Sequence, residues 1–323
     1  PENLPGLHAL HCPISFSSFL SLYRPAVQLS PELIVAQLRE LGTDRIFTVP
    51  GESFLAVLDA LHDEPSIELI VCRHEAGAAT MAEAHGKLTG RPGVCLVTRG
   101  PGATHASVGV HTARHDSTPM LLLIGQVERM HRGREAFQEV EFEQMFAPLA
   151  KAALEIEAAE RVPEQVAEAY AKALAPRRGP VVISLPEDML VEQADATLVA
   201  RPDDPGEDAP SPADVAQVSA MLEVAKRPLV LVGGSVWDQQ AAEVLTAWAE
   251  ERGYPVVTTF RRQDYIDNTR PAFVGYTGVA LDPTLAQRIV SADVLLALGT
   301  RLADVSTGSY TLIEAPRPRQ TLI

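Results

Sequence analysis

The chain has 323 residues, of which 46% are hydrophobic, so it is long enough for two domains with ordinary cores. A formal net charge of −15 argues against nucleic acid or an anionic membrane surface as a partner. The sequence holds no apolar run of about 18 residues, the length that a membrane-spanning helix requires. Separated cysteines at positions 12, 72 and 95 indicate free thiols in a reducing cytoplasm.

Regular patterns begin at Ser30, after a serine-rich leader that lacks the basic segment of a secretory signal. We expect this leader, residues 1–30, to be flexible. Ser30, Pro31 and Glu32 have the residue types of an N-cap, a first helical position and an acidic first turn, so a helix should start there and stop at Gly42. Beyond it the expected strands are 45–49, 67–72, 93–98, 119–124 and 180–184, and the expected helices are 53–62, 76–89, 103–114, 145–154 and 163–174.

A second alternation follows residues 199–212, which are rich in proline and acids and read as a linker. Its expected helices are 212–225, 238–252 and 283–290, and its expected strands are 228–232, 255–259 and 293–298, with another strand beginning at 319–323. Strands that alternate with helices predict parallel sheets covered on both faces. The predicted fold is therefore α/β, with two three-layer parallel-sheet domains over residues 31–190 and 212–323, separated by a linker at 191–211.

The first candidate for chemistry is Glu75, which follows the apolar run 69–72 and the polar pair Arg73 and His74. If that run is a buried strand, Glu75 lies at its carboxyl end, the edge where parallel sheets bind ligands. A carboxyl group partly removed from water there can give and take a proton near neutrality. The alternative is a helix-starting acid that complements the helix dipole and pairs with Arg73.

Three further segments resemble ligand-binding turns. The stretch 97–105, "VTRGPGATH", places glycines where a strand gives way to a helix, so that the backbone can approach a ligand closely. The stretch 48–54, "TVPGESF", repeats that arrangement. The polar loop 125–141 offers an apolar side chain, Phe137, and an amide, Gln138. Each segment taken alone also fits a tight turn or a solvated connection.

Metal binding has little support in the sequence. His111 and His115 are four residues apart on an expected helix, a spacing that suits two zinc ligands. No third ligand has the matching spacing, and Cys-x-x-Cys and His-Glu-x-x-His patterns do not occur. We therefore expect a helix surface at these histidines and assign no metal ligand.

Taken together and in order, these motifs resemble one enzyme family. A Pro-Gly turn, Arg-His-Glu, Gly-Pro-Gly-Ala-Thr, "DSTPMLLLIGQV" and "FQE" are similar to the thiamine diphosphate-dependent enzymes of the acetolactate synthase and pyruvate oxidase group. The match over about residues 31–190 corresponds to that family's N-terminal, pyrimidine-binding domain. "PLVLVGGS" and "ADVLLALGTRLAD" resemble pieces of its Rossmann-like central domain, and the resemblance implies that this domain is cut short at residue 323.

The resemblance implies a role for Glu75. In this family the matching glutamate bonds the N1′ atom of the cofactor aminopyrimidine, which favours the imino tautomer and so activates the thiazolium carbon. The cofactor then carries the carbanion chemistry, and the protein supplies position and electrostatics. The residues that match cofactor-lining positions are Pro50, Gly51, Gly102, Thr104, His105, Phe137 and Gln138.

Two departures from the family pattern stand out. His105 replaces the asparagine that follows Gly-Ala-Thr in many members, which leaves the substrate open. The family's C-terminal domain, whose Gly-Asp-Gly and later asparagine hold Mg²⁺ and the diphosphate, has no counterpart in this sequence. The resemblance therefore implies half a site, completed by a second copy of the chain in a homodimer or tetramer, and an inactive chain when alone. FAD in the central domain, near Gly233 and Thr300, is a further alternative.

The leading hypothesis is thus part of a cytoplasmic enzyme that decarboxylates a 2-oxo acid such as pyruvate and transfers the two-carbon unit to an acceptor. Two alternatives stay open. One is a non-catalytic binding or assembly module that lacks the diphosphate-binding domain. The other is a nucleotide-binding α/β protein, which the lack of Gly-x-Gly-x-x-Gly after an early strand disfavours.

Overall fold

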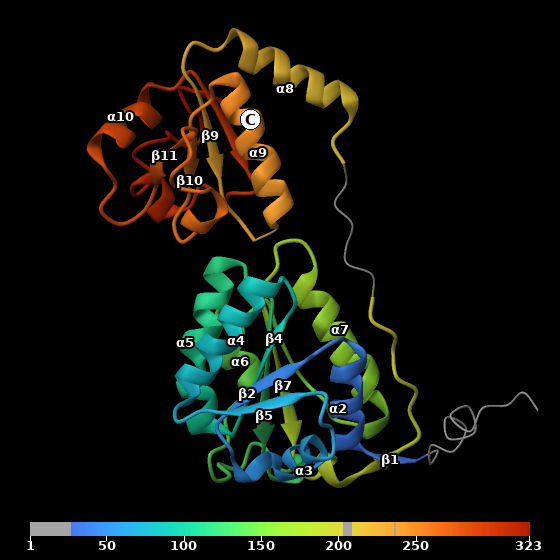
Figure 1. Cartoon of the computed structure of the whole chain (residues 1–323). Helices are drawn as coiled ribbons and strands as arrows, with labels where there is room; N and C mark the ends of the chain where they lie inside the picture. The colour runs from blue at the N-terminus through green and yellow to red at the C-terminus, as the bar shows by residue number, and fades with distance from the viewer. Residues whose placement is uncertain (1–26, 203–208, 236) are drawn as a thin grey trace, which may run out of the picture.

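The computed structural model describes residues 27–202, 209–235 and 237–323, so most of the expected leader lies outside the described residues. Two layered units, one on a six-stranded and one on a five-stranded sheet, follow each other along the chain (Figure 1). All pairings within both sheets are parallel, which confirms the predicted α/β class. Within the described residues, no helix is long and apolar enough to cross a membrane.

The first sheet has the strand order β3-β2-β4-β5-β7-β6. Its strands are β2 (Arg45–Thr48), β3 (Glu68–Val71), β4 (Gly93–Val97), β5 (Met120–Gln126), β6 (Ala152–Glu155) and β7 (Pro180–Pro186). The prediction of a buried strand before Glu75 is wrong, because β3 is an edge strand and its last residue, Val71, is 61% exposed. An apolar run shows that a strand packs on a core, but it does not show whether both of its edges are paired.

Helices cover both faces of this sheet. Alternate strand residues point to opposite faces. Val94 and Leu96 therefore join the core beneath α2, α3 and α7, while Cys95 and Val97 join the core beneath α4, α5 and α6. The bounds are α2 (Ser30–Glu40), α3 (Leu55–His62), α4 (Glu75–Thr89), α5 (Gly100–Asp116), α6 (Phe142–Phe146) and α7 (Val162–Leu174), with short 3₁₀ helices η1 (Glu52–Phe54), η2 (Arg129–His131), η3 (Ala159–Arg161) and η4 (Met189–Val191).

Two local predictions in this unit are wrong. Residues 145–154 do not form one helix, because the chain leaves α6 and enters β6, where pairing with β7 overrides the helical preference of its alanines and leucine. Ser30 is not the N-cap of α2, a position that Leu29 occupies. Instead the Ser30 hydroxyl is buried and donates a hydrogen bond to the Met189 carbonyl at 2.5 Å.

The second unit has the strand order β11-β10-β9-β12-β13 and helices on both faces. Its elements are α8 (Pro212–Val224), β9 (Pro228–Val232), α9 (Gln239–Arg252), β10 (Val256–Thr258), η5 (Gln263–Tyr265), β11 (Phe273–Tyr276), α10 (Pro283–Ser291), β12 (Val294–Leu298), η6 (Asp304–Thr307) and β13 (Thr321–Leu322). The predicted start of a strand near residue 319 is confirmed by β13, whereas β11 was not predicted. Before this unit, β8 (Gln193–Ala194), within the expected linker, pairs antiparallel with β1 (Gln28–Leu29).

Helices α4 and α5 approach each other closely at small residues. A Cβ atom added at Gly109 of α5 would lie 2.5 Å from the Ala79 Cβ of α4, so only glycine fits at this crossing. Ala78, Ala82, Ala103 and other small residues fill the remaining contact. The close approach fixes the relative position of the two helix N-termini, where Glu75 and the Gly-Pro-Gly segment lie.

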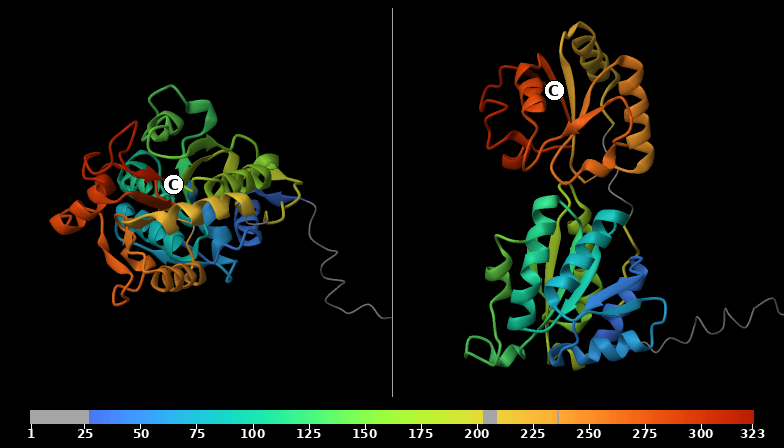
Figure 2. Two further views of the ribbon diagram at one scale, coloured as in Figure 1. Left: turned by 90° about the horizontal axis from the view of Figure 1, so that it is seen from above. Right: turned by 60° about the vertical axis from the view of Figure 1, so that its left-hand side comes forward.

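The second unit lies beyond one end of the first (Figures 1 and 2), and charged side chains join the two at the C-terminal ends of α4 and α5. The Asp116 carboxylate at the end of α5 lies 3.5 Å from Lys87 Nζ and 3.0 Å from Arg261 Nε of the second unit. Arg262 donates to the Asp116 carbonyl, and Arg301 donates to the His115 carbonyl at 2.8 Å. Burial lowers the pKa of Lys87, which nearby Arg262 lowers further and Asp116 raises. The Asp116 carboxylate is thus shared by Lys87 and Arg261, while Arg262 and Arg301 bind backbone carbonyls beside it.

The helix crossing gives a matched pair of stability predictions. Gly109→Ala should destabilise the fold by about 1–3 kcal/mol, because the added methyl group overfills the crossing. In Gly77→Ala, a change in α4, the new methyl group meets nothing within 4 Å and should stabilise the fold by about 0.5–1 kcal/mol, since alanine favours a helix. Urea unfolding monitored by circular dichroism measures both, and shifts of the same sign would contradict the packing described.

The charge cluster predicts weaker docking of the second unit in Asp116→Asn. Lys87 and Arg261 lose their common counter-ion, which should cost roughly 1–2 kcal/mol at this partly buried site. Hydrogen exchange of the backbone amides of residues 258–265 should therefore become faster. Asp59→Asn, a change at an exposed acid of α3, is the control. Equal exchange in both variants would show that Asp116 does not hold the units together.

Candidate functional site

The segments predicted to bind a ligand meet at one edge of the first sheet. Parallel strands all end at the same edge, and the helices that follow them begin there. Glu75 is the first residue of α4, and Gly100 is the first residue of α5. The 15 residues of α4 span about 22 Å, so this edge lies far from the charge cluster at Asp116. The second unit therefore leaves the edge uncovered.

Glu75 is paired with a histidine. Its Oε2 atom lies 3.0 Å from Nδ1 of His105, which projects from α5, so the predicted alternative of a pair with Arg73 is wrong. The Glu75 side chain is only 14% exposed, whereas that of His105 is 54% exposed. His74 stacks its ring on that of His105, with centroids 4.7 Å apart. The carboxylate is therefore largely shielded from solvent, and His105 holds one of its oxygens.

The Pro-Gly turn and the Gly-Pro-Gly segment pack on a single side chain, Thr98. A Cβ atom at Gly51 would lie 2.6 Å from Thr98 Cβ, and one at Gly102 would lie 2.9 Å from Thr98 Cγ2. Ser53 fixes the same threonine by a hydroxyl contact of 3.0 Å. The two glycines thus allow both turns to come together, with Pro50 exposed at the surface.

The Phe137–Gln138 segment is anchored to the start of α5. The Gly100 amide donates to the Gln138 carbonyl at 3.0 Å, and Gln138 has a left-handed φ of 65°. Glu139 closes the loop by accepting from the amides of Gly133 and Ala136, which lowers its pKa. Phe137 is left 77% exposed. The predicted loop therefore brings an apolar side chain to the same edge as Glu75.

Comparisons with known proteins agree with this arrangement. Residues 31–147 match the family model described as thiamine pyrophosphate enzyme, N-terminal TPP binding domain. Residues 215–323 match the model described as thiamine pyrophosphate enzyme, central domain. The chain belongs to the thiamine pyrophosphate enzyme family. Within this family, the expected order of an N-terminal and a central domain is confirmed.

Curated relatives point to one group of the family. The chain is 33% identical over 280 residues to an acetolactate synthase of Mycobacterium bovis, covering 86% of this chain and 45% of the relative. It is 32% identical over 279 residues to the large subunit of acetolactate synthase isozyme 2 of Escherichia coli, covering 85% and 50%. The chain spans about half the length of the curated relatives it matches.

Sequence reasoning missed a buried charge beneath the family's Gly-Pro-Gly turn. Arg99 is 7% exposed, and its guanidinium lies 3.0 Å from Glu187 and 3.3 Å from Glu52. It thereby ties the start of α5 to η1, which follows the Pro-Gly turn, and to the end of β7. An arginine directly before a glycine turn was the available signal, but its two acidic partners lie 47 and 88 residues away.

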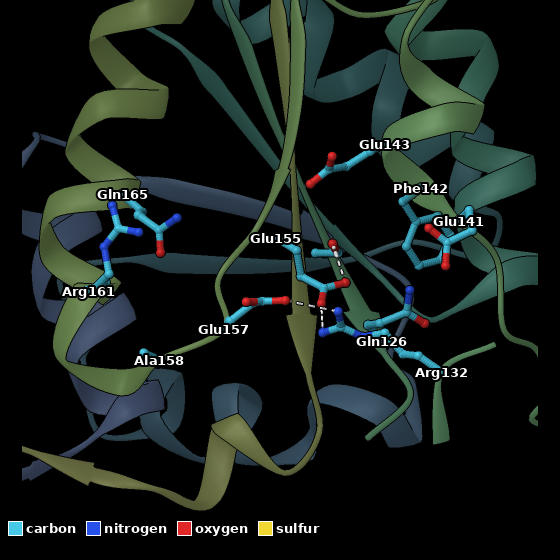
Figure 3. Close-up of a pocket in the computed structure, with 11 residues that line it drawn as sticks. Gln126, Arg132, Glu141, Phe142, Glu143, Glu155, Glu157, Ala158, Arg161 and Gln165 are labelled. Atoms are coloured by element: carbon cyan, nitrogen blue, oxygen red, sulfur yellow. Dashed lines mark hydrogen bonds and ion pairs between the residues drawn. The ribbon is translucent and has the colours of Figure 1, made fainter. Parts of the chain in front are cut away.

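A hollow of about 510 Å³ lies beside the site, at the ends of β5, β6 and β7 (Figure 3). Arg132 pairs there with Glu155 and Glu157, and Gln126 and Ser184 lie on the strand ends. The Gln126 amide donates to the Val140 carbonyl at 2.9 Å. The hollow is therefore walled partly by the loop that carries Phe137.

The residues that could hold a metal differ from those considered in the sequence. His74, Glu75 and His105 each offer a ligand atom within 4.8 Å of the others, the one such group among the described residues. However, Nδ1 of His74 already accepts the Ala76 amide, and Nδ1 of His105 meets Glu75. His111 and His115 stack on each other at 4.4 Å on α5. Cys72 and Cys95 are free thiols as predicted, and burial raises the pKa of Cys95.

The contact between Gly100 and Gln138 predicts a linked loop. In Gly100→Ala, the new methyl group would lie 2.8 Å from the Gln138 carbonyl, so the Phe137 loop must move away. We expect faster hydrogen exchange of the amides of residues 136–140, by roughly 10-fold, the effect of losing about 1.4 kcal/mol. Gly77→Ala serves as the control, and unchanged exchange in Gly100→Ala would refute the anchoring.

Proposed function

We propose that this chain supplies the cofactor-activating half of an acetolactate synthase-like enzyme. The complete protein decarboxylates a 2-oxo acid such as pyruvate and joins the two-carbon unit to an acceptor. The observation that carries the proposal is the position of Glu75, a partly shielded carboxylate at the ligand-binding edge of the sheet, next to two glycine turns. The names of the relatives support the same reaction class.

The residues present suit thiamine diphosphate. Glu75 offers a carboxylate oxygen to the N1′ atom of the aminopyrimidine, where it can share a proton. Gly51 and Gly102 have no side chains, so both turns can close on Thr98 and lie together at the edge that carries Glu75. The further lining residues that we propose are Pro50, Thr104, His105, Phe137 and Gln138. When bound, thiamine diphosphate supplies the carbon nucleophile that attacks the 2-oxo acid.

The side chains at this edge determine what the protein contributes to the chemistry of the bound cofactor. Glu75 holds or releases a proton at the ring, while the exposed Phe137 offers an apolar surface that excludes water from part of the edge. Arg99 keeps η1 and α5 in register through Glu52 and so maintains the spacing of the two glycine turns. We place Mg²⁺ and the diphosphate on protein outside this edge, as the family pattern implies.

We further propose a second copy of the chain as partner and the cytoplasm as location. Exposed apolar side chains lie on the elements that flank Glu75, namely Val71 at the end of β3, Met81 on α4 and Val108 on α5. Such side chains favour association. The proposed domain division is a leader before residue 31, a pyrimidine-binding domain at 31–190, a linker at 191–211 and a central domain from 212.

For FAD we make no assignment to this chain. Gly233 and Gly234 pack against Gly299 and Thr300, with a Cβ at Gly234 only 2.3 Å from the Gly299 carbonyl. Arg301, the residue that follows, donates to the His115 carbonyl of the first unit. This side chain therefore contributes to the contact between the units.

Replacing Glu75 tests the proposed function. In the complete protein with thiamine diphosphate and Mg²⁺, Glu75→Gln should slow hydrogen–deuterium exchange at the cofactor C2 atom by roughly 10²–10⁴, the span typical of an acid–base group. Proton NMR after acid quench measures the exchange. Glu160→Gln, at an exposed glutamate of η3, is the control. Equal rates in both variants would reject catalysis by Glu75 and favour the non-catalytic module.

A further inference from the structure

The contact between Glu75 and His105 joins two helices at the point where the chemistry is proposed. Glu75 Oε2 and His105 Nδ1 are 3.0 Å apart. An ionised carboxylate can only accept a hydrogen bond, so Nδ1 of His105 must carry the proton. In the neutral ring, Nε2 is then the unprotonated nitrogen. The contact thus selects one tautomer of His105 as well as one orientation of the carboxylate.

The imidazole ring of His105 is held in place from its other side. His74 lies against it with a centroid distance of 4.7 Å and an interplanar angle of 31°. His74 is itself fixed, since its Nδ1 accepts the Ala76 amide at 3.1 Å and thereby caps α4. The crossing of α4 and α5 at Gly109 keeps the two helices at a set separation. His105 therefore meets Glu75 in a preset geometry, although its ring is half exposed.

Only one oxygen of the carboxylate is used in this way. Within the described residues, Glu75 Oε1 has no hydrogen-bond partner, while Oε2 bonds His105. A carboxylate bonded at one oxygen cannot rotate freely, so the other oxygen keeps a fixed direction. The Glu75 side chain is only 14% exposed, so the carboxylate as a whole is largely shielded from solvent.

We propose that His105 is a positioning residue, which donates Nδ1–H to Glu75 Oε2 and so directs Oε1 toward the cofactor ring. This inference rests on the proposed function of Glu75. It explains how a histidine can stand where many family members carry asparagine. The Nδ2 amide of asparagine is placed like Nδ1 of histidine and can donate the same bond, whereas the longer glutamine places its amide like Nε2.

Four substitutions separate the hydrogen bond from the ring. His105→Asn keeps a donor in the Nδ1 position, and His105→Gln moves it. His105→Phe keeps a ring against His74 but removes the donor, and His105→Ala removes both. In the complete protein, C2 exchange should fall by about 10- to 100-fold in the Gln, Phe and Ala variants, the effect of losing a hydrogen bond to a charged group. The Asn variant should stay within about threefold of the unmodified protein.

Two further readouts do not depend on turnover. In the cofactor-free protein labelled with ¹⁵N-histidine, the signal that disappears in His105→Asn should have the chemical shifts of an Nδ1-protonated ring. Binding of thiamine diphosphate, measured by calorimetry, should weaken in the Ala and Phe variants but not in the Asn variant. His111→Ala, a change at an exposed histidine on the same helix, should leave C2 exchange and cofactor binding unchanged and should keep the signal assigned to His105.

These experiments distinguish a failure of the inference about His105 from a failure of the function proposed for Glu75. In the Glu75→Gln background, His105→Ala should add no further loss of exchange, because its effect passes through Glu75. If Glu75→Gln slows exchange and all His105 variants equal the unmodified protein, the inference is wrong and the proposed function stands. An Nε2-protonated ring, or rescue by Gln as complete as by Asn, would also overturn it. If Glu75→Gln has no effect, the proposed function itself fails.

Discussion

The close crossing of α4 and α5 is the constraint on which the candidate site depends. Gly109 meets Ala79 without room for a methyl group, so the helices pack nearly backbone to backbone. One helix begins at Glu75 and the other carries His105 near its start, so the crossing sets the distance between carboxylate and imidazole. A larger residue at the crossing would separate the pair even though it lies away from the edge. Packing and chemistry are therefore coupled through the helix pair.

The two ends of this helix pair have different tasks. At the N-terminal end, Glu75, His74 and His105 form a small polar group with one carboxylate oxygen unsatisfied by the described residues. At the C-terminal end, the Asp116 carboxylate pairs with Arg261 of the second unit, and Lys87 donates to the Arg261 carbonyl. Because parallel strands and their helices run in opposite directions, the polar group around Glu75 and the contact at Asp116 lie at opposite edges of the sheet. Docking of the second unit thus leaves the edge that carries Glu75 uncovered.

At that edge, loops from distant parts of the sequence are tied together by specific bonds. Arg99 joins Glu52 and Glu187, and the Gly100 amide joins the Gln138 carbonyl. A mobile edge would cost binding free energy to order, whereas these bonds set the loop positions before a ligand arrives. The edge therefore has the organisation expected of a cofactor site, in keeping with the family to which the chain belongs.

The sequence by itself determined the α/β class, most of the elements and the motifs of the family, because these depend on local periodicity and on turn residues such as Pro50, Gly51 and Gly102. It did not determine that β3 lies at an edge, that residues 152–155 form a strand, or that Ser30 bonds Met189. Those features arise from pairing between segments far apart in the chain. The partner of Glu75 was likewise decided only by tertiary structure, since His105 lies 30 residues away and is brought near by the helix crossing.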